Sequence, residues 1–210
     1  MSAGGSDWAA WAHEIQAIAQ NGLEYASDPY DRDRYAQLQR LAGKMMTANT
    51  GVVEADIVRL YADQSGYATP KAAVRGAAFR DGKLLLVREV ADQHRWTLPG
   101  GWSDVALTPA ENVAKEMREE TGFDVAPRKL AAAFDRNRQG MLAEPFHVYI
   151  LFFICEIVGG VATLSSETSE IGFFAEEDLP EELSLARVTK AHLHLMFKHF
   201  REPGRLTDFD

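Results

Sequence analysis

Three glutamates in one short segment could hold a divalent metal ion. Glu116, Glu119 and Glu120 stand in the run Lys-Glu-Met-Arg-Glu-Glu. On a helix, residues three and four apart lie on the same side, so these carboxylates would point in one direction. Like charges at that spacing cost about 0.2–0.5 kcal/mol per pair, which a bound cation would offset. Because no Cys or His stands among them, the oxygen ligands favour Mg²⁺ or Mn²⁺, cations that usually also bind substrate phosphates.

The same spacing is common on solvated acidic helix faces, so the flanking residues matter. Thr108 is a good N-cap, Pro109 suits the first helical position, and Glu111 completes a capping box. Gly122 stands where a left-handed residue ends a helix. Before the helix comes Leu98-Pro99-Gly100-Gly101, where glycines let the backbone approach a ligand closely. A capped helix behind a glycine turn favours a metal site over solvated surface.

The remaining pattern from residue 72 onward predicts the sheet that must position this helix. Residues 72–79 and 83–89 are strand-like runs joined by Asp81-Gly82, a strong two-residue hairpin signal. Further elements are expected as strands near 130–135, 147–157 and 171–175, and as a final helix over about 185–200. Strands with an early and a late helix predict an α/β (α+β) fold, a mixed β-sheet with helices on its faces.

The N-terminal region predicts a small all-helical domain. Residues 7–66 place apolar side chains at helical spacing in three short helices, the first closed by Asn21-Gly22. Helices this short make a thin core by themselves, so their apolar stripes need a partner, and we expect a homodimer. The expected domains are residues 1–66 and residues 67–210, with a linker over 64–71.

Composition excludes several classes of protein. The net charge of −9 argues against a general nucleic-acid binder, which normally carries a basic footprint, so no stable nucleic-acid partner is expected. Cys155 is the only cysteine, and the longest apolar run, residues 148–158, is too short to span a membrane. The first residues lack the basic and apolar parts of a secretory signal. We therefore expect a cytoplasmic protein with no membrane partner.

Gly101 through Phe123 resembles the Nudix box, which reads Gly, five residues, Glu, seven residues, then Arg-Glu-aliphatic-any-Glu-Glu-any-Gly-aliphatic. With the Leu-Pro-Gly-Gly-Trp segment and the upstream hairpin, the resemblance covers about residues 72–200. The helical region and the following Gly66–Pro70 segment are similar to a narrower bacterial subgroup that includes CDP-choline and ADP-ribose pyrophosphatases. The resemblance implies a Nudix-type sheet sandwiched between helices.

It also implies a metal-dependent hydrolase that cleaves the pyrophosphate bond of a nucleoside diphosphate linked to another group. In such an enzyme Glu116, Glu119 and Glu120 would bind Mg²⁺, with Mn²⁺ possible, and the Gly101 carbonyl would be a further ligand. Glu119 and Glu120 would thereby be catalytic. The general base of this family varies and often lies on a loop after the central strands; Glu167 fits that place better than Glu170 because of its spacing from Phe173.

Two positions of the box depart from the pattern. Leu107 replaces the first Glu, and Lys115 replaces the Arg. The resemblance implies that side chains at these positions orient the helix. Glu111 stands four residues before Lys115, the favourable order for a helical ion pair, so we expect Glu111 to take over part of the orienting role with Lys115. Because Arg and Lys differ in geometry, the support of the helix is altered while its metal ligands are intact.

Other candidate residues are less specific. Arg88 and Arg95 could contact substrate phosphates or be solvated surface residues. Asp135 and Arg136 end a strand next to a loop over residues 138–145 that could recognise the substrate. On the last helix His192 and His194 are two residues apart and cannot share a face, so both are expected on the surface.

Two other functions use the same features. A ligand-binding or regulatory module that has lost hydrolysis would explain the changes at Leu107 and Lys115, although the intact glutamates speak against it. A nuclease acting on RNA ends would use the same metal chemistry, but the acidic balance of the chain makes that a side activity.

Overall fold

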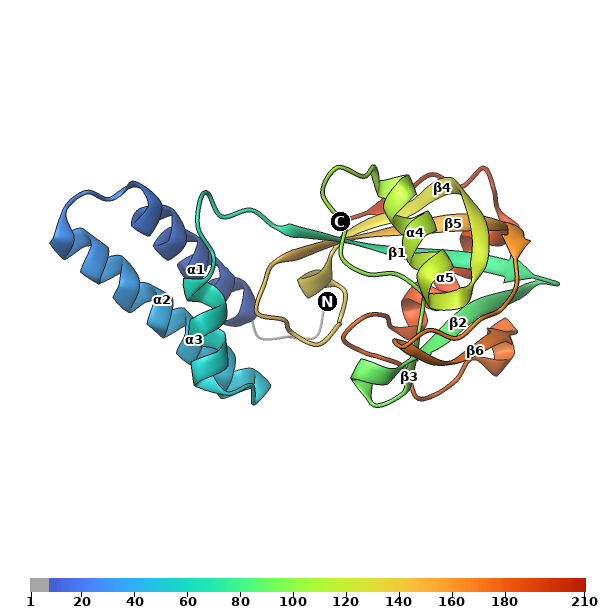
Figure 1. Ribbon diagram of the computed structural model, residues 1–210, viewed down its shortest axis with the longest axis horizontal. Helices are drawn as coiled ribbons and strands as arrows, with labels where there is room; N and C mark the ends of the chain where they lie inside the picture. The colour runs from blue at the N-terminus through green and yellow to red at the C-terminus, as the bar shows by residue number, and fades with distance from the viewer. Residues whose placement is uncertain (1–7) are drawn as a thin grey trace. The chain divides into compact units, whose positions relative to one another are not determined.

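The computed structural model describes residues 8–210, and in it the chain divides into two compact units (Figure 1). The first unit, here the helical unit, comprises the chain up to Lys71 together with Leu142–His147. The second, here the sheet unit, comprises Ala72–Met141 and Val148–Asp210. The short segment Leu142–His147 therefore leaves the sheet unit and packs with the helices.

The helical unit contains α1 (Trp8–Tyr25), α2 (Pro29–Thr50) and α3 (Glu54–Ala62). Its core consists of small and apolar side chains from the three helices and from the inserted segment: Ala12, Ala42, Met46, Ile57 and Tyr61, with Trp8, Ile15, Met45 and Phe146 packed against them. The Tyr61 hydroxyl donates to the Pro145 carbonyl at 3.0 Å. This contact fixes the inserted segment against α3.

The first helix does not end at Asn21-Gly22, as its sequence suggests, but continues to Tyr25. A Cβ at Gly22 would collide with the ring of Tyr35 on α2, so this glycine serves close helix packing rather than termination. The end of α2 follows the local rule: Gly51 has φ +73° and lies in the left-handed region. None of the helices within residues 8–210 is long and apolar enough to cross a membrane.

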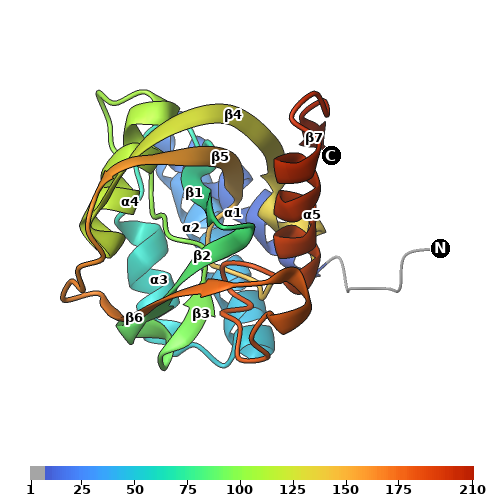
Figure 2. The same cartoon turned by 90° about the vertical axis from the view of Figure 1, so that its right-hand side faces the viewer.

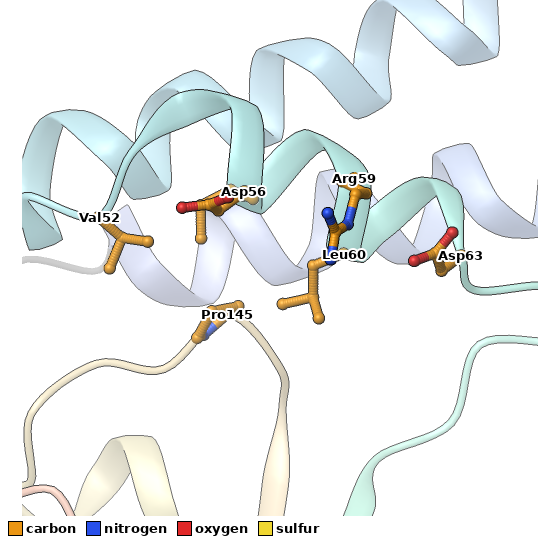
Figure 3. A pocket seen from close by; sticks show the side chains of 7 residues that line it. Val52, Asp56, Arg59, Leu60, Asp63 and Pro145 are labelled. Carbon is orange, nitrogen blue, oxygen red and sulfur yellow. The ribbon is translucent and has the colours of Figure 1, made fainter. Parts of the chain in front are cut away.

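The helical unit also has a pocket of about 310 Å³ (Figure 3). It is lined by Val52, Asp56, Ile57, Arg59, Leu60, Asp63 and Pro145. In Figure 3 the side chains of Val52 and Leu60 point toward Pro145, while charged side chains stand around them. None of the lining residues belongs to the candidate catalytic set, so this pocket carries no part of the chemistry considered below.

The sheet unit is built on a mixed sheet of seven strands. They are β1 (Lys71–Arg80), β2 (Lys83–Glu89), β3 (Arg95–Thr97), β4 (Phe123–Asp135), β5 (Val148–Gly160), β6 (Thr168–Phe174) and β7 (Asp208–Phe209). Their order is β3-β2-β1-β5-β4-β7, and β6 pairs with β2. β4 pairs antiparallel with β5 and parallel with β7. The predicted hairpin between β1 and β2 is confirmed: Asp81 and Gly82 have φ of 52° and 74°.

The sheet lies between α4 (Pro109–Thr121) and α5 (Lys190–Arg201), which Figure 2 shows on opposite sides of it. Side chains of β5 alternate between the two helices, as a strand covered on both faces requires. Phe153 packs in a cluster with Val113 and Met117 of α4, whereas the ring of Phe152 stacks on His192 of α5. The predicted sandwich of a mixed sheet between helices, preceded by a helical region, is confirmed.

His192 is not on the surface, contrary to the sequence expectation. Only 3% of it is exposed, and its ring lies against Phe134 and Phe152. Loss of solvent lowers the pKa of His192 to about 4, so the ring is neutral near pH 7. His194 does lie on the surface, where its Nδ1 is 3.0 Å from Glu176. The expectation failed for His192 because the apolar face of α5 includes it.

Candidate active site

The helix α4 is formed as its capping residues predict. The Thr108 hydroxyl accepts the Glu111 backbone N–H at 3.2 Å, and the Glu111 carboxylate accepts the Thr108 backbone N–H at 2.8 Å. At the other end Gly122 has φ +75° and donates its N–H to the Arg118 carbonyl. Val113 and Met117 are completely buried against the sheet, which fixes the rotation of the helix and the direction of its carboxylates.

Glu120 is the most buried of the three candidate ligands. Its side chain accepts the Gly100 backbone N–H at 2.8 Å, and only 7% of the residue is exposed. Burial raises the pKa of Glu120 to about 7, against the opposing effects of Arg75 and of the Gly100 bond. A carboxylate this poorly solvated is stabilised by a nearby cation, and its anionic form suits a hard metal ion.

Glu116 lies beside Gly101 of the glycine turn. A Cβ added to Gly101 would stand 2.5 Å from Glu116 Oε2, so the glycine makes room for this carboxylate. Burial raises the pKa of Glu116 as well. The Gly101 carbonyl accepts the Val74 N–H at 2.9 Å, which leaves one of its two lone pairs for another partner. The glycine turn therefore brings a carboxylate and a backbone oxygen together.

Glu119 points toward a lysine rather than toward the other two glutamates. Lys115 Nζ lies 2.8 Å from Glu119, 3.6 Å from Glu116 and 3.2 Å from Asp104. Within residues 8–210 the structure brings no three or more His, Cys, Asp or Glu side chains together as a ready metal cage. The donors that are in place, two desolvated carboxylates and a carbonyl, are hard oxygen ligands and fit a divalent cation such as Mg²⁺.

The predicted ion pair between Glu111 and Lys115 is wrong. The Glu111 carboxylate is engaged by the backbone and side chain of Thr108, at 2.8 and 2.7 Å. The unpaired N–H groups at a helix N-terminus attract a carboxylate strongly, and the capping box satisfies them. Lys115 instead reaches back to Asp104 in the loop before the helix.

The two candidate phosphate-binding arginines are engaged by acidic neighbours. Arg88 lies 2.9 Å from Glu182 and 3.7 Å from Glu170. Arg95 lies 3.4 Å from Asp92. All of these pairs are at least partly exposed, so each contributes about 0–1 kcal/mol and a substrate phosphate could replace the acidic partner.

Glu167, the candidate general base, is exposed on the turn that leads into β6. The next residue, Thr168, is buried and its hydroxyl donates to the Glu120 carbonyl at 2.9 Å. The Glu167 carbonyl accepts the Val90 N–H at 2.9 Å. Two contacts thus fasten this turn, one of them to the C-terminal end of α4.

Asp135 and Arg136 organise the end of β4. Arg136 is 4% exposed and donates from Nε and Nη2 to the Ala186 carbonyl, at 3.1 and 2.6 Å. The Asp135 carboxylate accepts the Asn137 N–H at 3.0 Å. Residues 142–145 of the loop predicted to recognise the substrate belong to the helical unit. The contacts of Arg136 give it a structural role in joining β4 to the segment before α5.

Sequence inspection missed three charged groups near the glutamates, Arg75 and the pair of Glu89 with Arg187. Arg75 is buried in β1 and donates from Nη1 to the carbonyls of Leu98, at 3.2 Å, and Gly100. Its positive charge opposes the rise in the pKa of Glu120. A charged residue within the otherwise apolar run 72–79 was the available signal. The Arg187 guanidinium bonds the Glu89 carboxylate, and nothing in the local sequence pointed to that pair.

Models of two known domain families match the chain. A model of the NUDIX domain matches residues 69–196. A model described as a UDP-X-like, N-terminal oligomerisation domain matches residues 6–61. The first match covers strands β1 to β6, α4 and the glycine turn, and the second covers most of α1 to α3.

Individual relatives agree with these matches. YjhB of Bacillus subtilis, to which ADP-ribose pyrophosphatase activity is provisionally ascribed, is 41% identical over 203 residues, 97% of each chain. The crystal structure of an ADP-ribose pyrophosphatase from Streptococcus suis is 38% identical with a TM-score of 0.62, covering 68% of this chain and all of that one. The crystal structure of a UDP-X diphosphatase is 32% identical with a TM-score of 0.60, covering 97% of this chain and 98% of that one.

Proposed function

Because this chain belongs to the NUDIX family, we propose that α4 and the Leu98–Gly101 turn form its active site. The protein is a metal-dependent hydrolase that cleaves the pyrophosphate bond of a nucleoside diphosphate linked to a second group. The products are a nucleoside monophosphate and the phosphorylated second group. One observation carries the assignment of the site: the buried Glu120 carboxylate is held by the Gly100 N–H at 2.8 Å, on the helix that also carries Glu116 and Glu119.

In this proposal Glu116, Glu119 and Glu120 hold Mg²⁺, or Mn²⁺ in its place, with the Gly101 carbonyl as a further ligand. The ion would polarise phosphoryl oxygens, lower the pKa of a bound water and neutralise charge on the departing phosphate. Glu120 is oriented by its bond to Gly100, and Glu116 by its contact with Gly101. Glu119 must turn away from Lys115 to join them.

We propose ADP-ribose as the first substrate to test, with CDP-choline and UDP-linked compounds as alternatives. The support is the ADP-ribose pyrophosphatase activity named for two relatives that are 41% and 38% identical. The relative that is 32% identical is a UDP-X diphosphatase, so UDP-linked compounds are among the substrates to test. The candidates for substrate contacts are still Asp135, Arg136, Arg88 and Arg95. The same screen tests which nucleobase the site accepts.

The test is a substrate screen on the full chain. Each compound is incubated with Mg²⁺ or Mn²⁺, and release of nucleoside monophosphate is measured by chromatography. Turnover of at least one nucleoside diphosphate derivative, lost on adding a chelator, supports the proposal. If no such compound is turned over with either metal while one of them binds, the chain is a ligand-binding module and the proposed activity is wrong.

Glu167 is proposed as the general base that accepts the proton of the attacking water. Its turn is fastened to α4 through Thr168, whereas Glu170 lies opposite Arg88 in the β2–β6 pairing and 3.7 Å from its guanidinium. We expect Glu167→Gln to lower kcat by about 100-fold with little change in KM, because proton transfer contributes at least that factor.

The matched control for this prediction is Glu170→Gln, which removes the same charge three residues further on, within β6, and should keep kcat within about threefold of wild type. Initial rates at saturating substrate and metal measure both variants. A larger loss of kcat for Glu170→Gln than for Glu167→Gln would mean that Glu170, not Glu167, is the general base.

We further propose that residues 1–66 form a dimerising domain and residues 67–210 the hydrolase domain. On α1, Trp11, Ile18 and Tyr25 are spaced by seven residues and so share one face, yet they are 56%, 50% and 71% exposed. The match to an oligomerisation domain over residues 6–61 supports a second copy of this chain as the partner.

Light scattering at micromolar concentration should therefore give the mass of a dimer. The double variant Trp11→Lys, Ile18→Lys should shift it to a monomer, because two buried charges oppose the association. Val158→Lys, which alters a 58% exposed residue of the sheet unit, serves as the control and should remain dimeric. A monomeric wild-type protein would refute the proposal.

A further inference from the structure

Lys115 contacts two of the proposed metal ligands and also a third carboxylate, which is not a proposed ligand. Lys115 Nζ lies 2.8 Å from Glu119, 3.6 Å from Glu116 and 3.2 Å from Asp104. We propose that Asp104 is a positioning residue: it holds Lys115 when the glutamates turn to the metal ion. This inference rests on the proposed function, since it concerns the same site.

The backbone at Asp104 is held firmly. Its N–H donates to Asn112 Oδ1 at 2.7 Å, and Asn112 Nδ2 donates back to the Asp104 carbonyl at 3.3 Å. Asn112 is 1% exposed and belongs to α4, so the loop is fastened to the helix that carries the glutamates. The short Asp104 side chain therefore reaches Lys115 from a backbone position that α4 holds in place.

A fixed partner matters because the lysine and the metal ion compete for the same carboxylates. Without metal, the Lys115 ammonium offsets the repulsion between Glu116 and Glu119. When a divalent cation is bound, the ammonium is a like charge beside it and must give up Glu119. Asp104 provides a negative partner away from the metal, which lowers the electrostatic cost of that exchange.

Asp104 also explains how Lys115 of α4 keeps an acidic partner in the preceding loop although position 107 is an apolar leucine. An apolar side chain at 107 offers nothing to Lys115. The carbonyl of Leu107 accepts Asn112 Nδ2 at 3.4 Å, so Leu107 and Asp104 lie on one loop fastened by the same asparagine. The acidic partner that this loop offers to Lys115 thus stands at position 104, three residues before Leu107.

The Asp104–Lys115 pair contributes little to the free energy of folding. A positioning role of Asp104 can therefore be told apart from a role in stability. The side chains of Asp104 and Lys115 are 55% and 37% exposed, and pairs of this kind contribute little stability. A loss of metal affinity in a variant with an unchanged unfolding midpoint would therefore report on the site itself.

The experiment measures Mn²⁺ affinity by the electron paramagnetic resonance signal of the free ion, together with turnover. Asp104→Asn keeps the shape of the side chain and removes its charge; we expect about tenfold weaker Mn²⁺ binding and a similar loss of kcat/KM at low metal, as for other residues that orient ligands. Adding Leu107→Glu to that variant restores a carboxylate on the same loop and should recover affinity to within about twofold of wild type.

The matched control is Asp124→Asn, which removes an exposed carboxylate 3.1 Å from Arg118 on the same helix and should leave Mn²⁺ affinity unchanged. If Asp104→Asn binds Mn²⁺ like wild type, or if Leu107→Glu fails to restore the affinity that it lost, the inference is wrong. A wild-type protein that neither binds Mn²⁺ nor hydrolyses any substrate would instead overturn the proposed function, so the two failures are distinguishable.

Discussion

Replacing Glu120 by Gln is expected to lower kcat by about 1,000-fold while the protein stays folded. The amide has nearly the same shape, and its oxygen can still accept the Gly100 N–H that Glu120 now accepts at 2.8 Å. The variant lacks the negative charge that a metal ion requires. Since burial raises the pKa of Glu120 to about 7, removing this desolvated charge should leave the thermal midpoint equal to that of wild type or above it.

The measurement combines turnover at saturating metal with the thermal unfolding midpoint. Glu156→Gln is the matched control, because Glu156 is an exposed glutamate whose carboxylate pairs with Arg128 at 2.7 Å. It should keep the wild-type rate. If Glu120→Gln retained the wild-type kcat, the metal assignment on α4 would be wrong even if the protein hydrolysed pyrophosphates.

Replacing Gly100 by Ala is expected to destabilise the protein by about 3 kcal/mol or more, with loss of activity in the folded fraction. Gly100 has φ +142°, a conformation that residues with a Cβ rarely adopt. A Cβ there would also collide with the Val74 carbonyl and stand 2.9 Å from Arg75 Cα. Both obstacles are backbone of the neighbouring strand, so they cannot move aside cheaply, and the Gly100 N–H would be displaced from Glu120.

Urea unfolding followed by circular dichroism measures this effect. The control is Gly140→Ala, which also places a Cβ at a positive φ, +68°, but with no atom within 4 Å of it. That variant should cost only about 1–2 kcal/mol, the local backbone penalty. Equal destabilisation of the two variants would mean that the tight approach of the glycine turn to β1 contributes nothing.

Features specified by nearby residues could be predicted from the sequence. The ends of α4 are set by Thr108, Glu111 and Gly122, each within one turn of the helix end that it caps. The turn between β1 and β2 is set by Asp81 and Gly82. In both cases the hydrogen-bonding groups involved are a few residues apart, so the local sequence contains all the information that their geometry needs.

Features that depend on a residue distant in the sequence could not be predicted in this way. Gly22 looks like a helix end, but its role is decided by Tyr35 of the neighbouring helix. The spacing of His192 from His194 predicts a surface position, but the ring of His192 lies against those of Phe134 and Phe152. The same amino acid can serve either role, and only packing selects one.

The carboxylate helix shows both cases in one element. The sequence by itself determined that Glu116, Glu119 and Glu120 share one side of a capped helix, because helical spacing is a local property. Only the tertiary structure decided the environments of two of them: Glu120 is desolvated under Gly100 and Glu116 lies against Gly101. The pair of Glu119 with Lys115 is four residues apart on the same helix and is again local. The burial of Glu116 and Glu120 comes from chain segments that meet only on folding, and this burial raises the pKa of both carboxylates.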